Sequence, residues 1–485
     1  MGIDIGTSAV KTVILDQAGD IVGEAKAALP ISRPQDLWSE QDPADWWVAT
    51  DRAVSALPAV LRRRVGAIGL TGQMHGATLL DADDRTLRPA ILWNDGRSAR
   101  ECVELTDKVP EMGRITGNLA MPGFTAPKLL WVRRHQPALW DRLATVLLPK
   151  DFIRLRMTGE KATDLSDASG TLWLDVGRRR WSETMLAACG LAIGQMPALH
   201  EGNDIAGRLR REVAQGWGMD IVPVAAGAGD NAASAVGIGV VHSGDALLSL
   251  GTSGVLFVAT DRFRPNPALA LHAFCHCLPE RWHQMSVTLS AAACIDWVAR
   301  LTRLVDAASL FAALEQSGRS QCDEIFLPYL SGERTPYNDP NAKGVFFGLT
   351  PLTDPTAAGM AVLEGVAMAI ADGFEALTQA GTKVDSITVV GGGARSPFWG
   401  RILASAVNRP LVYRRGAEMG PAAGAARLAR LALTQEPVLQ VCSAPPITHV
   451  IEPQDHLVAR LSAKRRKAAR LYAGVKDLFR EPPHV

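Results

Sequence analysis

The sequence predicts an α/β protein made of two related domains that hold a nucleotide between them. Residues 1–8 and 247–255 carry the same pattern, a short apolar run, then Gly-Thr-Ser, then apolar residues again. Each stretch is typical of a β-hairpin whose tight turn exposes backbone N–H groups and two hydroxyls. Phosphate oxygens accept hydrogen bonds from such donors. One such loop is a weak signal, but the presence of one in each half of the chain indicates that a nucleotide binds between the halves.

The length and the alternation of elements support this architecture. A chain of 485 residues is too long for a single core, so two or more domains are expected. The glycine-rich stretch Gly237–Gly244 is the expected boundary, which divides the chain into domains 1–240 and 241–485. Apolar runs alternate with amphipathic segments, as in sheets covered by helices. We expect strands at 65–70, 221–226, 246–250 and 387–390, and helices at 46–61 and 356–371.

Composition and charge argue against several classes of partner. Lys and Arg number 51 against 50 Asp and Glu, a net charge of +1, so nothing favours nucleic acid or a membrane surface. No apolar run approaches the ~18 residues of a membrane span, and Glu364 interrupts the most apolar candidate, Met360–Ala371. The N-terminus lacks an export signal, and seven scattered cysteines fit reduced thiols. We therefore expect a cytoplasmic protein that binds small molecules, with no nucleic acid or membrane partner.

The first Gly-Thr-Ser loop has a carboxylate beside it. Asp4 ends an unusually short strand, and Lys11 follows the loop. A carboxylate at this place is suited to hold Mg²⁺ next to phosphates. The alternative is a turn aspartate that bonds its own backbone. The neighbouring Gly6-Thr7-Ser8 favours the functional interpretation.

Asp230 follows a strand and a glycine-rich turn and precedes a helix of small residues. An aspartate before a helix is a preferred N-cap, which is a purely structural role. The functional alternative is a base that accepts the proton of an attacking hydroxyl, as in kinases. The run Gly227-Ala-Gly-Asp-Asn-Ala also resembles a dinucleotide fingerprint, but it lacks an acidic residue at the right distance.

A late glycine-rich turn is the third candidate for nucleotide contact. Ile387–Val390 is followed by Gly391, Gly392, Gly393 and Ala394. Ser396 is expected to cap the next helix and Pro397 to occupy its first position. Three glycines leave backbone space for a flat or charged ligand, although a structural turn is also plausible.

Other polar motifs allow both a functional and a structural interpretation. Met74 and His75 follow a predicted buried strand, where polar residues often line a site, yet a lone histidine is more often structural. The clusters at 93–97 and 332–336 have turn chemistry and fit plain loops equally well. The Cys275-His276-Cys277 spacing is a poor match to zinc sites, so no such metal is expected.

Longer motifs resemble a known family. The two hairpins and the Gly-Gly-Gly-Ala turn resemble the nucleotide cleft of the actin, Hsp70 and sugar-kinase superfamily. Residues 121–131 and 344–372 resemble the two signatures of the FGGY carbohydrate kinases, and the match runs from Gly2 to about Leu433. Four more segments are most similar to the branch of that family that phosphorylates D-xylulose: 38–43, 72–77, 91–97 and 327–336.

This resemblance implies a fold, an activity and a set of site residues. It implies two ribonuclease-H-like domains that flank a nucleotide cleft, with ATP and Mg²⁺ as cofactors and a sugar as acceptor. By motif, Asp230 would be the base and would contact the sugar with Met74 and His75, and Asp4 would be the magnesium residue. The residues implied at ATP are Gly6, Thr7, Ser8, Lys11, Gly251, Thr252, Gly392, Gly393 and Ala394. Kinases for ribulose, glycerol or gluconate, and an actin-like or Hsp70-like ATPase, are the alternatives, and the resemblance leaves open whether the chain forms a homodimer.

Overall fold

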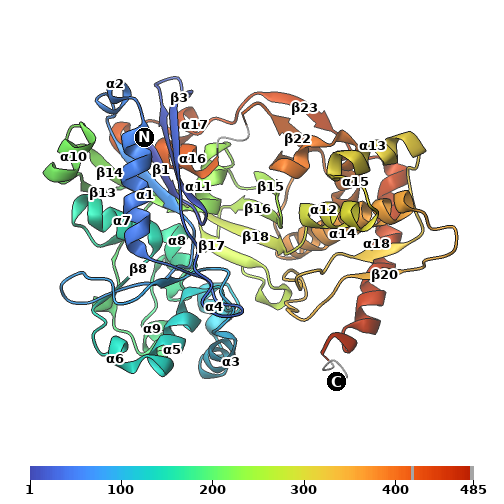
Figure 1. The fold of residues 1–485 in the computed structure, drawn as a ribbon, viewed down its shortest axis with the longest axis horizontal. Coiled ribbons are helices and arrows are strands. Elements are labelled where there is room, and N and C mark those ends of the chain that lie inside the picture. The colour runs from blue at the N-terminus through green and yellow to red at the C-terminus, as the bar shows by residue number, and fades with distance from the viewer. Residues whose placement is uncertain (417–419, 481–485) are drawn as a thin grey trace.

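Two β-sheets, one in each half of the chain, form the framework of this computed structural model (Figure 1). The structure describes residues 1–416 and 420–480. The first sheet has the order β13-β14-β5-β1-β2-β3. Its strands are β1 (Gly2–Ile5), β2 (Ala9–Leu15), β3 (Ile21–Ala28), β5 (Ile68–Gly72), β13 (Ile205–Arg208) and β14 (Pro223–Gly229).

The second sheet repeats the arrangement of the first. Its order is β17-β18-β16-β15-β21-β22-β23. Both sheets contain three neighbouring antiparallel strands, β3-β2-β1 and β18-β16-β15, followed by two strands that run parallel to β1 or β15, and the second sheet has β17 in addition, antiparallel to β18. Two related α/β domains are therefore confirmed. The strands are β15 (Ala246–Leu250), β16 (Gly254–Thr260), β17 (His272–Cys275), β18 (Trp282–Thr288), β21 (Ile387–Val390), β22 (Leu411–Arg414) and β23 (Ile447–Ile451).

Helices cover both sheets (Figure 1). Around the first sheet lie α1 (Pro43–Ala56), α7 (Pro149–Thr158), α8 (Leu165–Ser169), α10 (Arg211–Trp217) and α11 (Asp230–Gly237), whereas α3 (Ala99–Lys108), α5 (Thr125–His135) and α9 (Glu183–Cys189) pack against one another below it in Figure 1. Around the second lie α12 (Ala292–Leu301), α13 (Ala307–Ser317), α14 (Pro355–Gln379), α15 (Pro397–Val407) and α18 (Asp455–Val475).

The helix α16 (Gly420–Thr434) comes from the second half of the chain but packs against β1 and β5 of the first sheet and against α11. Two glycines permit this approach. A Cβ atom on Gly69 would lie 1.9 Å from the carbonyl oxygen of Ala425, and one on Gly424 would lie 1.8 Å from that of Ala233. The segment 238–245 also connects the sheets, and the division into 1–240 and 241–485 stays a prediction.

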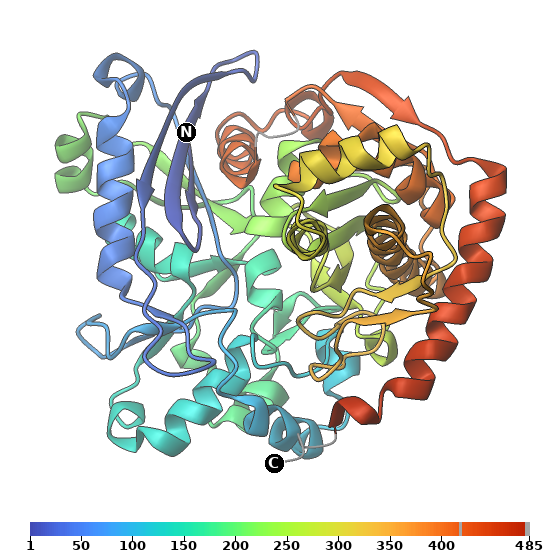
Figure 2. The same ribbon diagram turned by 45° about the vertical axis from the view of Figure 1, so that its right-hand side comes forward.

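The helix α14 forms the centre of the second hydrophobic core. By length and composition it is apolar enough to cross a membrane, but 89% of its most apolar window is buried inside the protein. Its Glu364 is fully buried and pairs with Arg460 and Lys464 of α18, the helix along the outer edge of this half (Figure 2). A helix that is apolar on all sides is here a core helix.

The predicted elements agree with the structure apart from their ends. The strands predicted at 246–250 and 387–390 have the observed bounds, whereas β5 and β14 begin two or three residues later than expected. The helix predicted at 46–61 is two helices, α1 and α2 (Ala59–Arg62). The break falls at Leu57, which is extended with ψ 146°. A proline disfavours helical geometry in the residue before it, and Pro58 follows Leu57.

Candidate active site

The first Gly-Thr-Ser loop is the turn between β1 and β2. The N–H of Gly6 donates to the carbonyl of Ala9 and closes the turn at 3.1 Å. The Thr7 hydroxyl donates to Gln73 Oε1 at 3.1 Å and accepts from Trp93 Nε1 at 2.9 Å. Gln41 donates to the Thr7 carbonyl at 2.7 Å. The sequence predicted no site role for Gln41 or Trp93. The only signal for them was that they lie in segments 38–43 and 91–97, which resemble the sugar-kinase family.

Asp4 lies directly opposite Lys11 in the β1–β2 pair. Its Oδ1 atom is buried and accepts no hydrogen bond from the described residues. Burial, together with the charge of Asp230, raises the pKa of Asp4 to about 8, although Lys11 opposes the shift. A buried carboxylate oxygen without a partner suits a cation such as Mg²⁺, which would restore its ionised form.

Lys11 has a partner on the neighbouring strand. Its Nζ lies 3.4 Å from Glu24 of β3, and both side chains are partly exposed. The ion pair is a surface contact of small energetic weight. The predicted contact of Lys11 with a phosphate stays a prediction.

Asp230 is the first residue of α11, and the residue at the N-cap position is Gly229. The sequence alternative in which Asp230 caps the helix is therefore wrong, because its own backbone is already helical. One carboxylate oxygen, Oδ1, accepts from the backbone N–H of Asn231 at 2.8 Å and from its side-chain amide at 3.0 Å. Burial raises the pKa of Asp230 to about 6 against these hydrogen bonds. The other oxygen stays available to receive a proton.

The ring of His75 is held in one orientation. Its Nδ1 lies 2.7 Å from the carbonyl oxygen of Gly170, which can only accept, so Nδ1 carries the proton. Burial, aided by Lys128, lowers the pKa of His75 to about 3, and the imidazole is neutral. Nε2 is then a hydrogen-bond acceptor for a hydroxyl group.

The backbone at His75 is also fixed. It has φ +70°, a left-handed conformation unusual for a residue with a side chain. Lys128 Nζ and the Thr125 hydroxyl both donate to its carbonyl, at 3.0 and 3.2 Å. The side chain of Met74 lies against Gly229, where a Cβ atom would meet the Met74 sulfur at 3.0 Å. Met74, His75 and Asp230 therefore lie close together, as predicted.

A loop of the second domain faces the same pocket. The positive charge of Arg334 contributes to the lowered pKa values of His75 and His272. Thr335 anchors this loop, since its hydroxyl donates to the carbonyl of Ala270 at 3.0 Å. The polar cluster at 332–336 therefore contributes a charge that acts on His75 and His272.

The second Gly-Thr-Ser loop joins β15 to β16, in the same position as the first. The carbonyls of Thr252 and Gly251 accept from Ala291 and Ala292, where α12 begins, at 2.8 and 3.0 Å. These hydrogen bonds fix the loop to the start of α12.

The late glycine turn lines a cavity between the two domains. Gly391 has φ +95°, and Gly392–Arg395 form a short 3₁₀ turn. Ser396 caps α15 and Pro397 occupies its first turn, as predicted. Only the backbone of Ala394 is described. The cavity has a volume of about 320 Å³ and is lined from the first half by Asn231, Ser234 and Ile238, and from the second by Leu247, Ser249, Val255, Phe257, Val390, Gly391, Gly392, Arg395 and Gly420.

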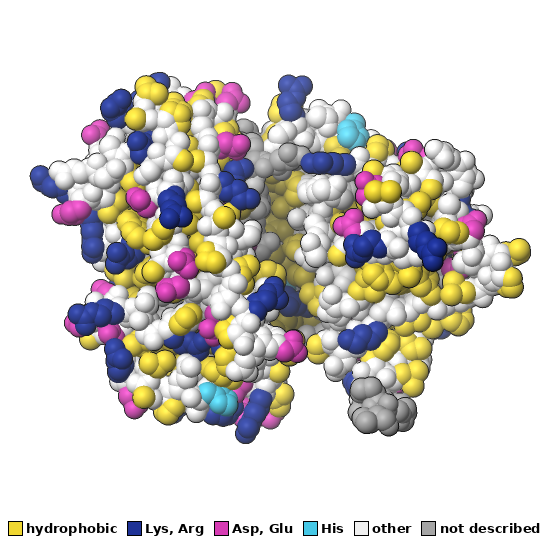
Figure 3. All heavy atoms as spheres, viewed as in Figure 1, with side chains coloured by type: hydrophobic (Ala, Val, Ile, Leu, Met, Phe, Trp, Pro, Cys, Tyr) yellow, Lys and Arg dark blue, Asp and Glu magenta, His cyan; other side chains and the backbone are white. Residues whose placement is uncertain are grey.

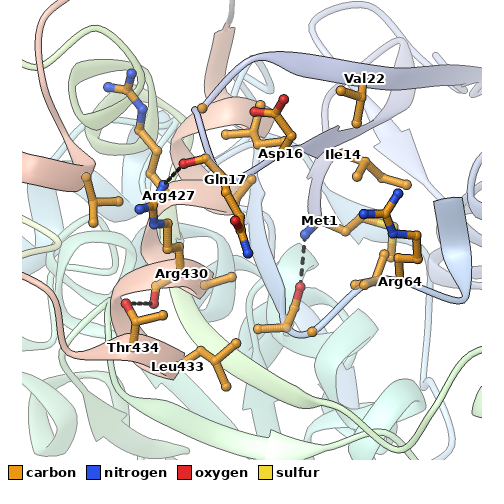
Figure 4. A pocket seen from close by; sticks show the side chains of 18 of the residues that line it. Met1, Ile14, Asp16, Gln17, Val22, Arg64, Arg427, Arg430, Leu433 and Thr434 are labelled. Carbon is orange, nitrogen blue, oxygen red and sulfur yellow. Dashed lines mark hydrogen bonds between the residues drawn. The ribbon is translucent and has the colours of Figure 1, made fainter.

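The space-filling view shows the surface hollowed between the halves (Figure 3). A larger cavity of about 1170 Å³ lies elsewhere, between the start of β1, the β2–β3 turn and α16, with Met1, Asp16 and Arg430 in its lining (Figure 4). None of the predicted site residues lines that cavity. The candidate site is therefore identified by the chemistry of its side chains and not by the volume of the cavity.

The fold and the site define a phosphotransferase with two related domains around a nucleotide cleft. Models of the FGGY family of carbohydrate kinases match this chain, the N-terminal domain over residues 1–237 and the C-terminal domain over residues 246–433. The chain belongs to this family and is a sugar kinase.

Individual relatives match over the full length. The chain is 54% identical to the xylulose kinase of Escherichia coli K12 and 52% identical to that of Klebsiella pneumoniae, covering 99% of each chain in both comparisons. The crystal structure of a xyloylose kinase from Brucella ovis has a TM-score of 0.95 at 49% identity, over 98% of this chain and 99% of that one.

Proposed function

We propose that this sugar kinase transfers the γ-phosphoryl group of ATP to the terminal hydroxyl of D-xylulose. The observation that carries the proposal is that Asp4 of β1 and Asp230, which directly follows β14, lie on either side of β5 at the same edge of the first sheet, where Met74 and His75 follow β5. The charge of Asp230 also contributes to the raised pKa of Asp4. High identity to xylulose kinases over the whole chain supports the choice of sugar.

In the proposed reaction Asp230 accepts the proton of the attacking sugar hydroxyl. Proton transfer takes place late, as bond formation to phosphorus acidifies the hydroxyl, so a pKa of about 6 is sufficient. His75 Nε2 accepts from a sugar hydroxyl and orients the acceptor together with Met74. The two Gly-Thr-Ser loops, with Thr7 and Thr252, align the phosphates.

Mg²⁺ is the proposed metal, held by Asp4 and by the phosphates of the nucleotide. When bound, the ion offsets the charge that develops on the transferred group. Within the described residues no three His, Cys, Asp or Glu side chains form a metal-binding group of their own. The turn at Gly391, Gly392, Gly393 and Ala394 is the proposed contact for adenosine, because its first two glycines line the cavity between the halves.

The cellular location and the oligomeric state of the enzyme are also proposals. We place the enzyme in the cytoplasm, because all seven cysteines are free thiols. A homodimer is a prediction that sedimentation velocity would check.

A coupled assay for ADP release, run over pentuloses, hexuloses, glycerol and gluconate, tests the choice of sugar. D-xylulose should give the highest kcat/KM, and a higher value for glycerol or gluconate would refute the choice. The variant Asp230→Asn tests the base. Its turnover should fall by at least ~10²-fold with ATP binding unchanged. Near-normal turnover would show that Asp230 is not the base.

A further inference from the structure

Five charged side chains are completely buried behind the site. Lys150 is the centre of this cluster. Its Nζ lies 2.6 Å from Asp151, 2.9 Å from Asp164 and 3.3 Å from Asp167, and Arg154 lies 3.7 Å from Asp151. All five side chains have 0% exposure. We refer to these residues as the buried charge cluster.

The cluster contains two cations and three carboxyl groups. Burial raises the pKa of Asp167 well above its usual value, helped by Asp151 and Asp164 and opposed by Lys150. With a proton on Asp167 the cluster is neutral, which lowers the cost of placing it in the interior. Buried ion pairs generally add little stability over apolar residues of the same volume. Stability alone therefore does not account for five buried charges here.

The cluster is bonded to the strand that ends at the proposed base. Arg154 donates to the carbonyls of Ala225 and Ala226 in β14. Asp164 caps α8 and accepts from both the N–H and the hydroxyl of Ser166. The Ser166 hydroxyl in turn accepts from the backbone N–H of Gly229 at 3.1 Å. Gly229 immediately precedes Asp230.

The other end of α8 contacts the sugar pocket. Gly170 follows the helix, and its N–H donates to the carbonyl of Asp167 at 3.0 Å. Its own carbonyl accepts from His75 Nδ1. A Cβ atom on Gly170 would lie 2.6 Å from the His75 ring, so the helix end and the ring are in close contact. One five-residue buried helix thus contacts both Asp230 and His75 through their immediate supports.

We propose that α8 and the buried charge cluster form a positioning unit for phosphoryl transfer, in which Ser166 fixes the backbone that carries Asp230 while Gly170 fixes the ring of His75. The inference rests on the proposed roles of these two residues. The unit sets the distance between the base and the sugar ligand, and the charge cluster anchors the helix. Ser166 and the cluster residues are positioning residues, since none of them touches substrate.

The same helix provides a matched control. The Ser169 hydroxyl is also buried, donates to the carbonyl of Leu165 at 2.7 Å and accepts from the N–H of Cys275 in β17 at 3.0 Å. Ser166→Ala and Ser169→Ala each remove one buried hydroxyl and leave one backbone N–H without its partner. They differ in the strand that loses the bond and in the acceptor that loses its donor, which is the Asp164 carboxylate for Ser166 and the Leu165 carbonyl for Ser169, and only Ser166 is linked to the base.

Steady-state kinetics and thermal unfolding of both variants test the proposal. Ser166→Ala should lose at least as much thermal stability as Ser169→Ala, because its hydroxyl also donates to a buried carboxylate. Ser166→Ala should lower kcat by about tenfold or more, because a 1 Å displacement of a reacting group costs up to ~10²-fold, with the KM for ATP unchanged. Ser169→Ala should stay within about twofold of the parent kcat, and Ser166→Thr, which keeps the hydroxyl, should recover most of the activity.

Equal kcat values for Ser166→Ala and Ser169→Ala would overturn the positioning role, as would a loss in Ser166→Ala that Ser166→Thr does not recover. Asp230→Asn separates this failure from failure of the proposed function. An inactive Asp230→Asn with equal serine variants would refute only the positioning role. An active Asp230→Asn would refute the base itself. If Ser166→Ala does not fold, Ser166→Cys replaces it in the same comparison.

Discussion

Adding one methyl group at Gly424 should damage catalysis from a distance. Gly424 lies in α16 at its crossing with α11, the helix that begins with Asp230. A Cβ atom there would lie 1.8 Å from the carbonyl oxygen of Ala233, and real Cβ atoms essentially never come closer than 3.0 Å. The two helices must therefore separate by about 1 Å or more. Overpacking of this kind costs ~1–3 kcal/mol, and a 1 Å displacement of the base costs up to ~10²-fold in rate.

Gly424→Ala would be measured by chemical denaturation and by the coupled kinase assay. Gly474→Ala is the control, since Gly474 lies in α18 with no atom within 4 Å of the new Cβ. There the better helix propensity of alanine should leave stability unchanged or raise it by up to ~1 kcal/mol. The same gain in helix propensity at Gly424, up to ~1 kcal/mol, does not exceed the ~1–3 kcal/mol cost of overpacking. A Gly424→Ala enzyme with parental stability and kcat would refute the view that this crossing fixes α11.

Three further predictions concern the sugar, pH and domain motion. His75→Ala should raise the KM for D-xylulose far more than the KM for ATP in steady-state assays, because a sugar hydroxyl loses its buried acceptor; equal changes in both would contradict a sugar contact. Burial holds the pKa of His276 near 3 against 6.5 in the unfolded chain, so its contribution to stability is complete above pH 6.5 and falls by roughly 1.4 kcal/mol per pH unit below it. Because other buried histidines and carboxyl groups also titrate in this range, the loss is measured as the difference between the parent and His276→Gln in urea denaturation at pH 7.5 and 5.5, and equal changes in both proteins would contradict it. The cleft should close about Gly237–Gly244, so the radius of gyration from small-angle scattering should fall on addition of D-xylulose with a non-hydrolysable ATP analogue, whereas an unchanged curve at saturation would favour a preformed cleft.

The repeated hairpins and their chemistry could be predicted because they depend on local sequence. Gly-Thr-Ser between two apolar runs specifies a tight turn, and the structure has that turn at Gly6–Ser8 and Gly251–Ser253. The helix start at Ser396-Pro397 was predicted for the same reason, since capping involves residues three positions apart. The equivalence of the two domains also follows from the chain, because each half has the same order of elements.

Helix ends and caps that depend on backbone geometry were less predictable. The pattern 46–61 has one continuous amphipathic period, and only the conformation before Pro58 divides it into α1 and α2. Asp230 precedes a helix of small residues as a cap would, yet the strand β14 delivers a backbone that is already helical at this residue.

The sequence by itself determined the fold class and the local turns that carry the proposed site residues. Only the tertiary structure decided how these groups are held. The link from Lys150 through Asp164 and Ser166 to Gly229 joins residues up to 79 positions apart, and the contact of Gly424 with Ala233 joins two helices far apart in the chain. Such contacts have no local signature, because they depend on how separate elements pack and on which charges are removed from water together.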